Sequence, residues 1–191
     1  MLFNNFYKTE YAFNWKELET ILEKMVLIEN QDHLERGDAI TSFKNKIKPY
    51  DLLELKDFYN FIEPIYKDIL INKWGYPIEN EYYIGNSWVS KYGEGGYIEE
   101  HNHTSVVAVI CAYLQLPPNS ANILFRDPNY ETKVKFSVTN DDWLWRELEC
   151  KTNDVLIFEG GCFHKTKPNN SKMSRWVLTT NIMKRNLSKT I

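Results

Sequence analysis

Three of the four histidines in this 191-residue sequence lie in two short segments rich in strand-forming residues. His101 and His103 flank Asn102, and His164 follows 61 residues after His103. Side chains two positions apart in a strand point to the same face, so both imidazoles of the pair can reach one centre. Imidazole is a good ligand for zinc, copper, iron and nickel, so three converging histidines would form a metal site. A lone histidine in a strand is more often a hydrogen-bonded structural residue, and this alternative stays open here.

An arginine accompanies the histidines. Arg175 opens an apolar run eleven residues after His164, and in a strand it shares one face with Val177, Thr179 and Asn181. A buried guanidinium is costly unless a carboxylate meets it, and no acidic residue lies nearby in the sequence. The pattern favours a ligand that brings its own carboxylate.

The elements that must position these residues are short strands. From Tyr82 onward, segments rich in Val, Ile, Phe, Tyr and Trp alternate with Gly, Pro, Asn and Asp. The expected strands are 82–91, 97–101, 105–116, 123–127, 133–138, 147–150, 154–159, 163–166 and 175–183. Because no long helix separates them, we expect an antiparallel jelly-roll core instead of a parallel α/β sheet.

The first third of the chain has helical periodicity. Apolar residues recur at helical spacing over 15–29 and 52–74, and Pro64 should kink or split the second helix. The polar stretch 31–50 should be a loop with at most a short helix. We therefore expect an α+β, mainly β fold in one domain, 1–191. Its helical layer (1–78) would pack on one sheet of a cupin-like double-stranded β-helix (79–185).

Composition narrows the functional classes. The net charge of −3 gives no reason to expect nucleic acid or an acidic membrane as partner. Three cysteines without framework spacing indicate reduced thiols and a cytoplasmic protein. No signal-peptide pattern is visible at the N-terminus. The longest uncharged stretch, 104–125, meets Pro117 and Pro118 before it reaches the roughly 20 apolar residues of a membrane span.

Residues 92–103, 109–114 and 154–158, followed by His164 and Arg175, together resemble the 2-oxoglutarate- and iron(II)-dependent oxygenases. The similarity is greatest to the prolyl-hydroxylase-like branch and to a group of small uncharacterised members. It covers about 82–183, the β half of the chain.

The resemblance implies a role for each matching residue. His101 and His164 match the iron ligands, and Arg175 matches the basic residue that holds the far carboxylate of 2-oxoglutarate. Tyr113 matches a tyrosine that assists this residue, and Tyr92 matches one that lines the co-substrate pocket. The expected pocket residues are Arg175, Tyr113, Tyr92 and, because they share the face of the arginine, Thr179 and Asn181.

His103 departs from the family pattern, which has an aspartate or glutamate at this position. Imidazole is an acceptable iron ligand, so we expect a three-histidine site. The alternative is that His103 points away, which would leave Glu99 or Glu100 as the third ligand, or only two protein ligands.

The activity that the resemblance implies is hydroxylation. An iron(II) dioxygenase of this kind uses O2 to decarboxylate 2-oxoglutarate to succinate while it hydroxylates a peptide or protein side chain, or a small metabolite. Two alternatives come from other classes: a cupin-type three-histidine metalloenzyme that does not use 2-oxoglutarate, and a catalytically silent β-sandwich binding module. The sequence does not indicate the substrate or the oligomeric state.

Overall fold

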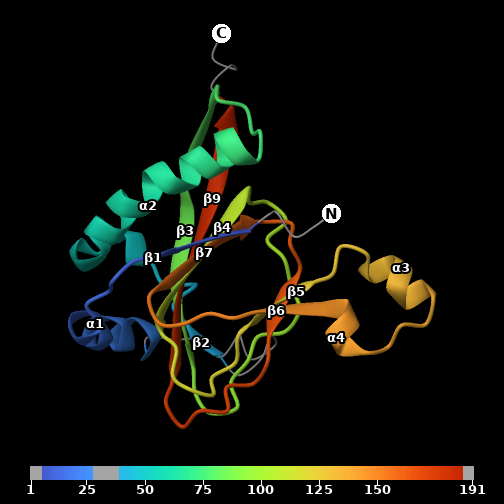
Figure 1. Cartoon of the computed structure of the whole chain (residues 1–191). Coiled ribbons are helices and arrows are strands. Elements are labelled where there is room, and N and C mark those ends of the chain that lie inside the picture. The colour runs from blue at the N-terminus through green and yellow to red at the C-terminus, as the bar shows by residue number, and fades with distance from the viewer. Residues whose placement is uncertain (1–5, 28–38, 187–191) are drawn as a thin grey trace.

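The computed structural model describes residues 6–27 and 39–186, and most of its strands form one large antiparallel sheet (Figure 1). This six-stranded sheet has the order β1-β7-β4-β9-β3-β2. Its strands are β1 (Phe6–Glu10), β2 (Ala39–Thr41), β3 (Asn80–Tyr92), β4 (Ala108–Gln115), β7 (Asp154–Glu159) and β9 (Arg175–Asn186). A smaller sheet has the order β6-β5-β8, with β5 (Ile123–Arg126), β6 (Trp145–Leu148) and β8 (His164–Thr166).

Helices cover one face of the large sheet. These are α1 (Trp15–Leu27) and α2 (Lys56–Asp68), which Figure 1 shows on the same side of the strands. Short 3-10 turns at Pro49–Asp51 and Leu53–Leu55 precede α2, and a π-helical turn at Ile69–Lys73 extends it. Two short helices, α3 (Tyr130–Lys135) and α4 (Asp141–Leu144), form an insertion between β5 and β6.

The large sheet is buried on both faces, which explains the nearly continuous apolar runs in β4 and β7. Alternate side chains divide between two cores. The helix-side core contains Ile110, Ala112, Val155, Ile157 and Leu178 together with Leu22, Phe58 and Ile62 of the helices. The opposite core contains Val109, Cys111, Tyr113, Leu156, Phe158 and Val177 together with Phe125 of the smaller sheet. The interior between the two sheets is therefore separate from the helical layer.

The two antiparallel sheets and the helical layer confirm the predicted mainly β architecture. Three of the expected strands need correction. Residues 133–138 begin inside helix α3, where Val134 and Phe136 are exposed and no sheet face is available to bury them. Residues 97–101 form a loop with a single isolated bridge at His101. Residues 163–166 form only the three-residue strand β8.

The N-terminal third also differs from its expectation. Strand β1 was not predicted, and β2 lies in the segment expected to be a loop. Helix α2 is not split at Pro64. Proline has no amide hydrogen, so the carbonyl group four residues earlier lacks its partner within the helix. Pro64 lies on the exposed face, where water can satisfy this carbonyl group. The end of the helix expected at 15–29 lies outside the described residues.

Within the described residues, none of the helices combines the length and the apolar character that crossing a membrane requires.

Candidate metal and co-substrate site

The fold brings His101 and His164 together through a β-bridge between two distant segments. The His101 amide donates to the His164 carbonyl at 3.0 Å, and the His164 amide donates to the His101 carbonyl at 2.9 Å. This reciprocal pairing places the two ring centroids 4.2 Å apart. The backbone of β8 and of the loop after β3 thus sets the spacing of the two imidazoles.

His103 completes a group of three. Its amide donates to the Gly160 carbonyl at 2.8 Å, which ties the His103 loop to the end of β7. The His103 ring centroid lies 5.3 Å from that of His101 and 5.4 Å from that of His164. One potential ligand atom from each ring lies within 4.8 Å of the other two, so a single metal ion can contact all three.

Each of the three imidazoles is oriented by an oxygen at its Nδ1 atom. Nδ1 of His101 lies 2.8 Å from the Glu99 carbonyl oxygen, and Nδ1 of His103 lies 2.8 Å from the Asn181 amide oxygen. Nδ1 of His164 lies 2.9 Å from the Cys162 carbonyl oxygen. An Nδ1–H that donates to an oxygen leaves Nε2 with its lone pair, which is the form that binds metals. Burial, together with the neighbouring His101, holds the pKa of His164 well below its ordinary value, so this ring is neutral near pH 7.

No carboxylate belongs to the histidine group within the described part of the chain. The Glu99 side chain is exposed, and this residue contributes its backbone carbonyl to His101 instead. The Glu100 carboxylate lies 2.7 Å from a guanidinium nitrogen of Arg126. The structure thus brings His103, and neither glutamate, to the other two histidines.

Arg175 is buried at the start of β9, with 1% of its surface exposed. Its guanidinium lies over the Tyr92 ring at 4.1 Å, and its Nη2 donates to the Thr166 hydroxyl at 3.0 Å. Its Nη1 donates to the Ala121 carbonyl, while the buried Nε has no hydrogen-bond partner among the described residues. No carboxylate of the described residues pairs with this cation, so the structure retains the feature that the sequence indicated.

Tyr92 and Tyr113 both belong to the core between the two sheets. Burial raises the pKa of both phenols, most strongly that of Tyr113, and the charge of Arg175 opposes this effect at each. The Cys150 thiol is a close neighbour of the Tyr113 phenol. Both side chains are therefore neutral phenols within the electrostatic reach of Arg175.

The other two expected pocket residues have different surroundings. Thr179 of β9 is paired with Cys111 of β4, and the Asn181 amide oxygen is hydrogen-bonded to His103. Asn181 thus belongs with the histidines and not with Arg175, although all of these residues lie on the inner face of the sheet.

A cavity of about 460 Å³ opens in front of the histidines. The sequence analysis missed its apolar wall. The Trp88 ring stacks on that of His103 at 5.9 Å, and Phe43 packs edge-on against Trp88 at 4.9 Å. Strand parity could have identified Trp88, because it lies four residues before Tyr92 and so faces the same side. Nothing in the local sequence places Phe43 here.

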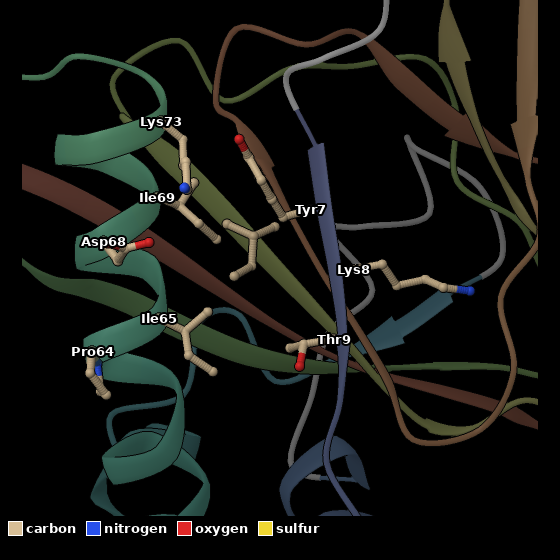
Figure 2. Close-up of a pocket in the computed structure, with 9 residues that line it drawn as sticks. Tyr7, Lys8, Thr9, Pro64, Ile65, Asp68, Ile69 and Lys73 are labelled. Carbon is tan, nitrogen blue, oxygen red and sulfur yellow. The ribbon is translucent and has the colours of Figure 1, made fainter.

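Within residues 6–27 and 39–186, the residues that line this cavity include no Asp, Glu, Lys or Arg. The aliphatic side chains of Ile98 and Val106 add to the aromatic wall, and the polar lining consists of uncharged groups and the imidazoles. A second groove, of about 390 Å³, lies between β1 and α2 (Figure 2). It reaches Ile157, which belongs to the helix-side core, so it opens on the other face of the sheet from the histidines.

The residues present fit a metal ion and a dicarboxylate. Three imidazoles with oriented Nδ1 atoms form a donor set suited to a divalent transition metal. The buried Arg175, with an Nε atom that lacks a partner, fits an incoming carboxylate. The fold and the site together define a jelly-roll protein with a candidate non-haem metal centre.

The family follows from a comparison of the sequence with protein-family models. Residues 86–181, just over half of the chain, match the model described as "Putative 2OG-Fe(II) oxygenase". The chain belongs to this family, whose cofactor is iron(II) and whose co-substrate is 2-oxoglutarate. The resemblance noted from the sequence is thereby confirmed. A search of curated proteins gives no match.

Solved structures of 2-oxoglutarate oxygenases share the fold. A Pseudomonas putida prolyl-4-hydroxylase superposes with a TM-score of 0.65 at 12% identity, covering 95% of this chain and 93% of that chain. A collagen prolyl hydroxylase of Paramecium Bursaria Chlorella virus-1, in complex with 2-oxoglutarate, gives 0.59 at 11% identity (93% and 95%). HygX of Streptomyces hygroscopicus, with nickel and 2-oxoglutarate bound, gives 0.58 at 9% identity (94% and 82%).

Proposed function

We propose that the protein is a 2-oxoglutarate-dependent hydroxylase that holds iron(II) through the Nε2 atoms of His101, His103 and His164. The observation that carries this proposal is the orientation of all three imidazoles by oxygens at Nδ1, beside a cavity whose described lining residues carry no carboxylate, ammonium or guanidinium group. The match to the family supports iron(II) and 2-oxoglutarate as the bound species.

Each group of the chain has a role in binding or orientation. Arg175 would pair with the far carboxylate of 2-oxoglutarate, and the buried Tyr92 and Tyr113 would exclude water from this pair. Thr166 would keep the guanidinium in place. When bound, iron(II) with 2-oxoglutarate and O2 supplies the oxidising chemistry, while the protein positions the reactants and limits access of water.

The cavity supports an uncharged group as the site of reaction. A charged substrate group would lose its hydration against Phe43, Trp88, Ile98 and Val106, and the lining residues that the structure describes offer no opposite charge to replace it. An aliphatic or ring-bearing part of a peptide side chain or small metabolite would instead gain contact with this wall. Two prolyl hydroxylases are among the structural neighbours, and at 11–12% identity they show the shared fold alone.

Anaerobic titration of the iron(II)-loaded protein with 2-oxoglutarate tests the proposal. We expect a visible charge-transfer band that saturates with 2-oxoglutarate, and succinate formation once O2 is admitted. In Arg175→Met the affinity for 2-oxoglutarate should fall at least about 30-fold, since loss of one partner of a buried charge pair costs about 2–5 kcal/mol. Metal affinity, measured by calorimetry with Mn(II), should not change.

Two other outcomes identify the alternatives. The three-histidine donor set is also suited to a metalloenzyme that does not use 2-oxoglutarate. In that case metal would bind, no band would appear, and Arg175→Met would behave as the wild type. If neither metal nor 2-oxoglutarate raises the melting temperature, the protein is a binding module and the proposal fails.

A further inference from the structure

Arg126 is the last residue of β5, the strand whose Phe125 faces the histidine cluster. The ring of the preceding residue, Phe125, faces His164 at a centroid distance of 6.0 Å. Because successive side chains in a strand alternate, Arg126 projects to the opposite, outer face of the smaller sheet. There its guanidinium lies between two aromatic rings, 4.1 Å from the Tyr130 centroid and 4.2 Å from the Phe163 centroid.

The same guanidinium also contacts the segment that carries His101. Its Nη2 lies 2.7 Å from the Glu100 carboxylate, and both side chains are partly exposed, at 23% for Arg126 and 31% for Glu100. The Arg126 amide donates to the Phe163 carbonyl at 2.9 Å, so backbone and side chain hold the same residue. A second ion pair, to Glu131 at 3.5 Å, involves a side chain that is 85% exposed and adds little.

The two contacted residues have one property in common. Glu100 directly precedes His101, and Phe163 directly precedes His164. Phe163, like Arg126, faces away from the cavity while the histidine that follows it faces inward. Arg126 thus joins, from the outer side, the two chain segments that the reciprocal His101–His164 bridge joins by hydrogen bonds.

The chemistry of this contact requires an arginine. The guanidinium is planar, so it can stack on a ring at each face while an edge nitrogen meets a carboxylate. A lysine ammonium could pair with Glu100 but could not fill the space between Tyr130 and Phe163. The Nε atom of Arg126 is buried without a hydrogen-bond partner in the described residues, so stacking and the Glu100 pair set the position of the group.

We propose that Arg126 is a positioning residue for the metal site: it clamps Glu100 and Phe163 and thereby holds in place the backbone pairing that sets the separation of His101 and His164. The inference rests on the proposed function, since it assumes that these histidines bind the metal. Contacts around metal ligands change metal affinity by about 10- to 100-fold when they are removed. Arg126 acts one residue away from each ligand, so a loss of about tenfold is expected.

The test compares Arg126→Met with Arg185→Met. Arg185 lies near the end of β9 and makes the same kinds of contact, an ion pair with Glu81 at 3.2 Å and a ring contact with Tyr83 at 4.9 Å. Affinity for Mn(II) is measured by calorimetry, and the melting temperature is measured without metal. We expect about tenfold weaker Mn(II) binding in Arg126→Met, none of this loss in Arg185→Met, and partial recovery in Arg126→Lys.

A purely structural role predicts a different result, a lower melting temperature with wild-type Mn(II) affinity, and this result would overturn the inference. If Arg126→Met does not fold, Phe163→Leu and Glu100→Gln each remove one arm of the clamp and must each weaken Mn(II) binding. Wild-type protein that fails to bind Mn(II) would instead refute the proposed function, and the inference with it. Equal binding by the wild type and all clamp variants would refute the inference alone.

Discussion

The amide oxygen of Asn181 lies 2.8 Å from Nδ1 of His103, across 78 residues of sequence. At the same atom, His101 and His164 meet backbone carbonyls, whereas His103 meets the side chain of Asn181. The amide oxygen selects the tautomer that carries its proton on Nδ1. Asn181 therefore controls whether the third imidazole can serve as a ligand.

Substitution of Asn181 should weaken metal binding. In Asn181→Leu the Nδ1–H of His103 loses its acceptor, and we expect Mn(II) affinity to fall about 10-fold or more. Thr180→Val is the matched control, because the Thr180 hydroxyl lies 3.4 Å from that of Tyr59, on the helix side of β9. Calorimetric titration of the two variants decides the point, and equal affinities would show that Asn181 does not orient a ligand.

Replacement of His103 distinguishes a ligand from a bystander. His103→Ala removes one of three donors, so iron(II) affinity and the 2-oxoglutarate band should both decrease strongly. His103→Asp restores the two-histidine, one-carboxylate donor set typical of non-haem iron oxygenases, and should retain the band. Anaerobic spectra of the two variants provide the measurement. Full affinity in His103→Ala would exclude the three-histidine assignment while leaving the family unaffected.

Gly160 allows the His103 loop to pack against the end of β7. A Cβ atom at this position would overlap the Val106 carbonyl oxygen and lie 2.8 Å from that of His103. Since both contacts are with backbone atoms, Gly160→Ala must shift the loop, and we expect a loss of about 1–3 kcal/mol of stability together with weaker Mn(II) binding.

The neighbouring glycine is the control for this substitution. A Cβ atom at Gly161 would have no heavy atom within 4 Å, so Gly161→Ala should leave the stability and metal affinity unchanged. Chemical denaturation and calorimetry measure the two effects. Wild-type behaviour of Gly160→Ala would mean that the His103 loop tolerates displacement.

The α3–α4 insertion should be sensitive to acid through Asp127. Burial alone raises the pKa of this carboxyl, but its bonds with the Asn129 amide (2.8 Å) and Lys133 (3.0 Å) outweigh burial and lower the pKa. A carboxyl with a depressed folded-state pKa contributes stability that is complete above its unfolded pKa of about 3.9 and is lost as the pH falls through the folded value.

Asp127→Asn should remove this contribution. We expect a loss of about 1–3 kcal/mol at pH 7, because Lys133 and Arg146 lose their shared carboxylate, and a flatter stability profile below pH 4 (about the unfolded pKa). Denaturation at a series of pH values measures both effects. A variant whose acid profile parallels that of the wild type would contradict this origin of the acid sensitivity.

Local patterns in the sequence determined much of this protein. Successive side chains along 154–159 and 175–183 point to opposite faces, and apolar residues on both faces indicated buried strands. Helical spacing indicated α1 and α2. Both patterns depend only on neighbouring residues, so they can be read from the sequence. The His-x-His spacing predicted two imidazoles on one face. No acidic residue lies near Arg175 in the sequence, which indicated that the guanidinium pairs with a carboxylate of a ligand. In the structure this arginine is buried, and no carboxylate of the described residues pairs with it.

Only the tertiary structure decided which side chains meet. The His101–His164 bridge, the His103–Asn181 bond and the Trp88 wall each join residues from different strands or loops, and no local pattern specifies such pairings. The same holds for residues 133–138, which have a strand-like composition but form the last turn of α3 and the turn that follows it. The sequence alone determined which side chains could bind a metal and which strands and loops carry them. Long-range packing decided that these side chains meet at one site, since the energy of such contacts depends on segments far apart in the chain.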